Sequence, residues 1–144
     1  MSNTIFAGIV AAFVSRLEES PSVSSNVLRA MPREIAEQHT NAVNVQFDGA
    51  RPKESTIAGA PIDWISMISV ELYAKSTAQT GDLAVDPLLK GVYERIAADP
   101  TLGGVVAYVG IPSIDAEYDS KGQKTGWIRM MYPVEHRTNN STLD

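Results

Sequence analysis

Residues 62–75 read IDWISMISVELYAK, and this stretch decides the architecture of the chain. Apolar side chains share one parity of the stretch and polar side chains share the other: Trp64, Ile68, Val70 and Leu72 against Asp63, Ser69, Glu71 and Lys75. Successive side chains of a β-strand point to opposite faces, so the alternation predicts one buried face and one wetter face. At ~3.3 Å per residue the strand would extend roughly 46 Å, which is long for a globular protein. We therefore expect a central strand that is broken by a bulge or projects beyond its own domain.

Patterns on either side of this strand predict two helices. Apolar residues recur at helical spacing from Ile5 to Leu17, and Thr4 can cap the start of this helix. Small residues form its second face, which would pack on the chain's own sheet or meet another subunit: Ala7, Gly8, Ala11, Ala12 and Ser15. A second helix is expected over about residues 83–98, because Asp86-Pro87 suits a helix start and Asp99-Pro100 a helix end.

Further strands are predicted where apolar residues alternate or run continuously. They fall at residues 26–31, 42–48, 105–109, 113–119 and 125–134. The last two would form a hairpin across a glycine-containing loop. Pro133 lacks an N–H, so we expect the final strand to lie at a sheet edge there, or its regular pairing to stop there. Residues 49–61 carry two Gly and two Pro and are expected to be a connecting loop that could protrude.

Composition narrows the class of protein. A chain of 144 residues fits one domain, which we place at 1–138, with a flexible C-terminal tail at 139–144. The net charge of −5 argues against a protein that wraps the outside of a nucleic acid. The absence of cysteine excludes disulfides and thiolate chemistry and fits a reducing cytoplasm. Residues 5–14 are apolar but too few to cross a bilayer, and no basic leader precedes them, so we expect no membrane segment.

Catalytic and cofactor motifs are absent from the sequence. His39 and His136 are isolated, with no second metal-ligating residue at the usual spacing. There is no Gly-x-Ser-x-Gly elbow and no Gly-rich phosphate loop ending in Lys-Ser/Thr. Gly103-Gly104 runs into a predicted strand, whereas a phosphate site needs its glycines at a helix N-terminus. We therefore predict no catalytic residue, no metal and no cofactor.

One cluster of charged residues stands out. Asp115, Glu117 and Asp119 alternate with other residues, so on a strand they would share one face about 7 Å apart. Three interpretations stay open. The carboxylates could form a solvated face, hold a divalent cation, or make an acidic surface that repels a negative partner.

Two segments resemble a known family. Residues 96–106, IAADPTLGGVV, are similar to the segment that follows the second helix in phage tail terminators, which are also called minor tail protein U-like or tail completion proteins. Residues 128–138, IRMMYPVEHRT, resemble the closing strand of that family, which often ends in an aromatic-Arg-Thr step. Here His136 occupies the aromatic position. The N-terminal helix, the strand around 43–45 and the long central strand follow in the family's order, so the resemblance covers nearly the whole chain.

The resemblance implies an α+β fold in which two main helices pack on a mixed, mostly antiparallel sheet with a C-terminal β-hairpin. It implies a structural role without catalysis: a ring of copies, a hexamer, that caps the tail tube, stops its growth and offers the surface for head joining. The partners would be further copies, the tail tube protein and the head–tail connector protein. Such a protein would be cytoplasmic during assembly and then part of the virion tail, with DNA passing through it without specific binding.

On this hypothesis some residues acquire roles. Asp115, Glu117 and Asp119 would line the channel, because a negative lining keeps phosphates from binding. Positive residues of the predicted loop and of the hairpin tip would contact the tube or the connector: Arg51, Lys53, Lys121 and Lys124.

Two alternatives from other classes of protein stay open. One is a small enzyme whose site is assembled from scattered residues such as His39, Asp63 and His136. The other is a ligand-binding or regulatory module with a groove beside the long central strand.

Overall fold

A computed structural model describes residues 3–53, 59–118 and 125–144 as a single α+β domain. The helices are α1 (Ile5–Glu18), α2 (Arg33–Ala36) and α3 (Gly81–Ala97). The strands are β1 (Val27–Arg29), β2 (Asn41–Pro52), β3 (Ile62–Lys75), β4 (Tyr108–Val109), β5 (Ser113–Tyr118) and β6 (Thr125–Thr138). They form one sheet in the order β1-β2-β3-β6-β4, with β5 also paired to β6. Only the β1–β2 pairing is parallel among the described pairs, so the predicted fold class is confirmed.

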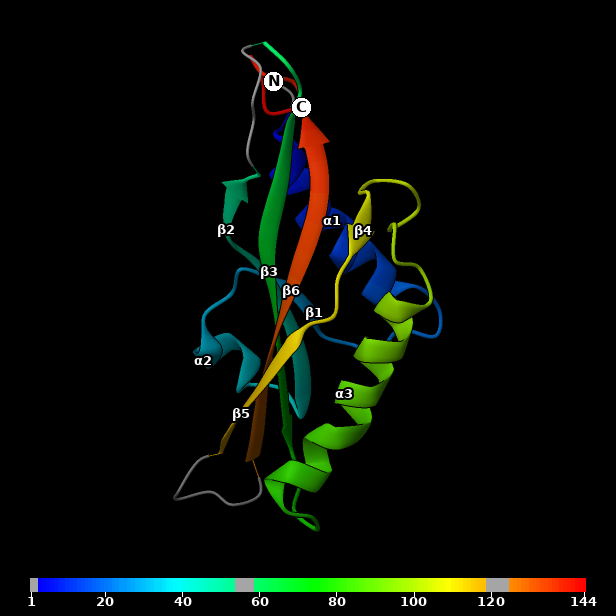
Figure 1. Cartoon of the computed structure of the whole chain (residues 1–144). Coiled ribbons are helices and arrows are strands. Elements are labelled where there is room, and N and C mark those ends of the chain that lie inside the picture. Colours follow the sequence, from blue (N-terminus) through cyan, green and yellow to red (C-terminus); the bar gives the residue numbers. More distant parts are fainter. Residues whose placement is uncertain (1–2, 54–58, 119–124) are drawn as a thin grey trace.

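The predicted central strand is β3, with the predicted bounds. It pairs with β6 along its whole length, from Ile62↔Thr138 to Lys75↔Thr125, and Figure 1 shows the two strands side by side through the middle of the molecule. The ladder between them is regular, and the bulge lies in β2, between Phe47 and Gly49. The prediction that Ser69 lies on a wet face is wrong, because its side chain is fully buried.

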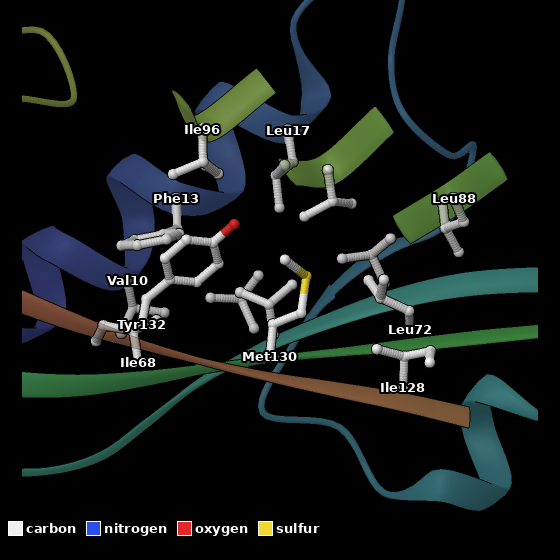
Figure 2. Close-up of a cluster of buried hydrophobic side chains, with 14 of the residues drawn as sticks. Val10, Phe13, Leu17, Ile68, Leu72, Leu88, Ile96, Ile128, Met130 and Tyr132 are labelled. Carbon is white, nitrogen blue, oxygen red and sulfur yellow. The ribbon is translucent and has the colours of Figure 1, made fainter. Parts of the chain in front are cut away.

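The hydrophobic core lies between one face of the sheet and the two long helices. Figure 2 shows side chains of α1 and α3 converging on the even-numbered residues of β3 and β6: Val10, Phe13, Leu17, Leu88 and Ile96 against Ile68, Leu72, Ile128, Met130 and Tyr132. The rings of Phe13 and Tyr132 lie 5.5 Å apart. Each such side chain stabilises the fold by about 1.5–3 kcal/mol when fully buried. The apolar residues at helical spacing and those at strand spacing therefore pack together in one core.

Both ends of the chain meet at the start of α1. Thr4 Oγ1 accepts a hydrogen bond from the Ala7 amide at 3.4 Å, as expected of a helix cap. The Leu143 carbonyl accepts one from the Ile5 amide at 2.7 Å, so the segment predicted to be a flexible tail contacts the helix start. Of the small residues of α1, Gly8, Ala11 and Ser15 are exposed. No helix in the described ranges is long and apolar enough to span a membrane.

Two predicted boundaries are wrong. Gly49 to Pro52 continue β2 rather than open a loop, because the bulge at Asp48 lets the strand resume its pairing with β3. The strand expected at 105–109 is reduced to Tyr108–Val109. Leu102, Gly103 and Gly104 all have positive φ (51°, 72° and 92°), so the chain turns there and leaves Val105 exposed.

Pro133 lies inside the sheet rather than at its edge. On one side it is opposite Met67 of β3. On the other side the partner of β6 changes at this point, because β5 ends at Ser113↔Met131 and β4 pairs at Val109↔Val134. The Gly110 amide donates to the Pro133 carbonyl at 2.7 Å between them. The regular pairing of β6 therefore stops at Pro133 on its outer side, which was one of the two expectations for this residue.

Candidate assembly surface

The face of the sheet opposite α1 and α3 is called the open face below. Figure 1 shows that α2 lies on the other side of the β3–β6 ladder from α3. It covers one end of the open face, where Ala36 packs with Ala42, Tyr73 and Trp127. Farther along the strands four apolar side chains stay half-buried, and no helix of the described ranges packs on them: Ile65, Met67, Met131 and Pro133.

Ion pairs join neighbouring elements across the open face. They pair Arg137 with Asp63 at 2.8 Å, Arg33 with Glu117 at 2.7 Å, Lys53 with Glu135, and Arg129 with Asp48. Hydrogen bonds from Arg137 lower the pKa of Asp63, and those from Arg33 lower the pKa of Glu117. Both carboxylates are therefore ionised at neutral pH. Four cations of this face are therefore held by carboxylates of the same chain.

The predicted channel-lining residues lie on the open face as far as the structure describes them. Asp115 and Glu117 are exposed and lie opposite Arg129 and Trp127 of β6. Arg33 neutralises Glu117 and also stacks over the Trp127 ring at 4.4 Å from its centroid. The charge of Glu117 is therefore balanced within the chain, and Asp119 lies outside the described residues.

Arg51 and Lys53 were predicted to contact partners from a loop, but they lie in and directly after strand β2. Arg51 is a strand residue of β2, exposed and opposite Ile65. Lys53 directly follows β2, where its amide donates to the Asp63 carbonyl at 2.7 Å and its side chain pairs with Glu135. Arg51 therefore lies in a strand rather than in a loop, because the bulged strand extends farther than the glycines and prolines suggest. Lys121 and Lys124 lie outside the described residues.

Of the residues considered for an enzyme, Asp63 and His136 line one hollow, whereas His39 lies far from both. His39 lies beside the Asn41↔Ala74 end of the sheet, whereas His136 is opposite Trp64. Ten residues of β3 separate these positions, which is roughly 33 Å. Asp63 neighbours His136 across the ladder but points to the other face. Among the residues that the structure describes, no three His, Cys, Asp or Glu side chains cluster as metal ligands would.

A buried polar pair was missed by the sequence analysis. Ser66 Oγ lies 2.6 Å from His136 Nε2, and both side chains are on the helix-covered face. The Phe6 ring packs on the imidazole at 5.3 Å and closes the pair off from solvent. Ser66 has the even parity of the buried residues of β3, and this signal was available in the sequence. The pair is a part of the core rather than a substrate site.

Two of the hollows in the described surface have volumes of ≈ 570 and ≈ 530 Å³. One of ≈ 570 Å³ lies between α2 and β5 and is lined by charged and aromatic side chains, among them Arg33, Glu71, Asp115 and Trp127. The other, of ≈ 530 Å³, lies where the start of α1 meets β1 and β2 and is mostly apolar, with Phe6, Val10 and Phe47 in its wall. The first touches the central strand only through Glu71, whereas a smaller hollow of ≈ 260 Å³ lies beside the start of β3, with Asp63, Trp64 and His136 in its wall.

Fold and surface together define an α+β domain whose sheet is covered by two long helices on one face and is largely open on the other. No protein-family model matches the chain, and no curated protein matches its sequence at a significant level.

Proposed function

We propose that the chain is a structural protein of a phage or prophage tail. In this proposal identical copies form a ring on the end of the tail tube, stop its growth and offer the surface to which the head is joined. The proposal rests on the family resemblance of residues 96–106 and 128–138 and on one structural observation. Among the described residues, the sheet has free strand edges on both of its sides: β2 beyond Val45 on one side and β5 on the other.

Free strand edges support self-assembly for a simple reason. Their unpaired N–H and C=O groups are a template for another strand. When two different edges of one molecule pair between copies, the contact is head-to-tail, and repeated contacts of this kind close into a ring if the rotation allows it. A hexamer of 15.6 kDa subunits would have a mass of about 94 kDa.

The charges of the open face fit a channel through which DNA passes. Binding to the DNA backbone depends on Lys and Arg side chains that neutralise phosphates. Here Arg33, Lys53, Arg129 and Arg137 are each held by a carboxylate of the chain. We infer that this face lines the channel and that its paired cations leave phosphates unbound. Lys121 and Lys124 remain candidates for contacts with the tube or the connector.

Light scattering across a range of protein and magnesium concentrations tests the proposal, with negative-stain images of the same samples. A species near six times 15.6 kDa that appears as rings with a central hole supports it. A protein that stays monomeric under all these conditions contradicts it. A stable dimer that binds a small molecule would favour the ligand-binding alternative instead.

A further inference from the structure

We propose that the ring closes by antiparallel pairing of the free edge of β2, residues 46–52, with β5 of the next copy. Arg51 of one copy would form an ion pair with Asp115 of its neighbour across this contact. The inference rests on the proposed function, because it names the contact through which the copies of that ring meet.

Both edges lack a strand partner in the described ranges. β1 pairs with β2 only up to Val45, where the Ala30 amide donates to the Val45 carbonyl at 2.9 Å. From Gln46 to Pro52, β3 is the strand that pairs with β2. On the far side of the sheet, β5 pairs with β6 alone. Each edge therefore has room for one more strand.

The strand directions suit this pairing. β2 is antiparallel to β3, β3 to β6, and β6 to β5, so β2 and β5 of one copy run in opposite directions. Rotation about the ring axis keeps the sense in which each strand runs along that axis. It places β5 of one copy beside β2 of the next in antiparallel orientation, which is the more stable of the two kinds of ladder.

The two edges carry complementary charges on the same face. Arg51 is opposite Ile65, and Asp115 is opposite Arg129, so both point to the open face. Both are exposed. Neither has an ion-pair partner among the residues that the structure describes, in contrast to the four ion pairs of the open face. Pairing between copies would give each of them the partner that it lacks within its own chain.

The edges also carry complementary apolar groups on the helix-covered face. Ile114 is opposite Met130 and is 48% exposed, and Phe47 is opposite Ile68 and is 42% exposed. Phe47 borders the apolar hollow formed with Phe6 and Val10. In the register that pairs Arg51 with Asp115, Ile114 lies opposite Pro52 on the same face, so the contact would remove the exposed Ile114 side chain from water.

The stagger between the edges matches the geometry of a closed barrel. Arg51 is level with Glu135 and Asp115 with Arg129, an offset of six residues along β6, or roughly 20 Å. The four strands from β2 to β5 span roughly 19 Å per copy at ~4.8 Å per strand. Pairing Arg51 with Asp115 therefore inclines the strands by about 45° to the ring axis, at the upper end of the tilt found in barrels. The two long helices, α1 and α3, would lie on the outer circumference of this ring, where there is more room.

Charge reversal tests the ion pair. Arg51→Glu and Asp115→Arg should each raise the protein concentration needed for ring formation by about tenfold or more, because like charges would then face each other. The double variant should restore assembly to near the wild-type concentration. Lys90→Glu, on the exposed surface of α3, is the matched control and should have no effect. Circular dichroism melts verify that each variant is folded.

Cross-linking tests the strand pairing without relying on charge. The chain has no cysteine, so Ala50→Cys and Ala116→Cys can be introduced as a single pair. With Arg51 opposite Asp115, antiparallel register places Ala50 opposite Ala116. Mild oxidation should give a ladder of covalent oligomers up to the ring, and the control pair Ala50→Cys with Ala98→Cys should not.

The outcomes separate the two proposals. Wild-type rings that persist in both single reversals, or a ladder no stronger than that of the control pair, overturn the β2–β5 contact and leave the proposed function standing. A wild-type protein that never assembles overturns the proposed function and the contact with it. Loss of rings in each single variant, rescue in the double variant and a specific ladder support both.

Discussion

His136 Nε2 and Ser66 Oγ lie 2.6 Å apart in the core, on adjacent strands β6 and β3. The imidazole is 4% exposed, and its Nδ1 has no hydrogen-bond partner within the described ranges. Burial lowers the pKa of His136 below its ordinary value of 6.5. The folded protein therefore holds this side chain neutral, with one hydrogen bond to a serine hydroxyl.

Stability should depend on the protonation of His136. The unfolded chain takes up a proton on this residue at a higher pH than the folded protein does, so the contribution is fully present above about pH 6.5. It is lost as the pH falls below that value toward the lower pKa of the folded state. We expect the free energy of unfolding to decrease between about pH 7 and pH 5, and this decrease to be smaller in the double variant His136→Phe/Ser66→Ala. Urea titrations at a series of pH values measure it.

The other histidine provides the control. His39→Gln should keep the wild-type pH dependence, since His39 is half-buried at the end of α2 and far from the core pair. If the free energy of unfolding fell equally with decreasing pH in the wild type and in the double variant, His136 would not be the group responsible.

Close backbone contact should make two glycines intolerant of substitution. A Cβ at Gly81 would lie 2.2 Å from the Thr125 carbonyl oxygen, and one at Gly126 would lie 2.2 Å from the Gly81 carbonyl oxygen. Because backbone atoms cannot move aside cheaply, Gly81→Ala and Gly126→Ala should each destabilise the protein by about 2–3 kcal/mol. Gly91→Ala, in α3 with nothing within 4 Å of the added Cβ, should instead stabilise it by up to about 1 kcal/mol. Chemical denaturation of the three variants compares them, and equal effects at Gly81 and Gly91 would contradict the close contact.

Arg95 joins the ends of the two long helices through hydrogen bonds. Its guanidinium donates to the carbonyls of Arg16 at 3.1 Å, Glu19 at 2.8 Å and Pro21, and Arg16 Nε donates back to the Arg95 carbonyl at 3.2 Å. We expect Arg95→Ala to destabilise the protein by about 2 kcal/mol, because charged donors to carbonyls are lost. Arg95→Lys should recover only a part, since an ammonium cannot reproduce the planar fork.

Lys90→Ala is the control for the Arg95 variants in thermal unfolding. Lys90 is an exposed residue of the same helix that lies 4.0 Å from Glu94, and its replacement should change stability by less than about 0.5 kcal/mol. If Arg95→Ala behaved in the same way, the three carbonyl contacts would not matter for stability.

Release of the paired cations should create DNA affinity. Asp63→Asn frees Arg137, and Glu117→Gln frees Arg33, on the face that we propose lines the channel. The combined variant should bind duplex DNA in a salt-dependent manner, whereas the wild type should not bind at physiological salt. Fluorescence anisotropy with labelled DNA measures this, with Glu94→Gln on α3 as the control. Equal affinity of the wild type and the combined variant would contradict the role of these pairs in keeping phosphates unbound.

The sequence alone determined the helices and strands that show a regular spacing of apolar residues within one stretch of the chain. The bounds of β3, the two long helices and the β5–β6 hairpin follow from apolar residues at spacings of two or of three to four, because these spacings place side chains on one face whatever the rest of the chain does. The helix cap at Thr4 and the exposed position of Asp115 and Glu117 on one face of β5 also follow from the local sequence.

Only the tertiary structure decided what depends on a distant partner. Arg33 and Glu117 are 84 residues apart in sequence, and Ser66 and His136 are 70 apart, so no local pattern could pair them. The extension of β2 past its bulge depends on β3 lying alongside, and the apolar run at 105–109 stays mostly out of the sheet because three positive φ angles turn the chain before it. The free edges of β2 and β5 exist only because β1 is short and β5 is the outermost strand, and backbone pairing of this kind is a property of the assembled sheet rather than of any single stretch of residues.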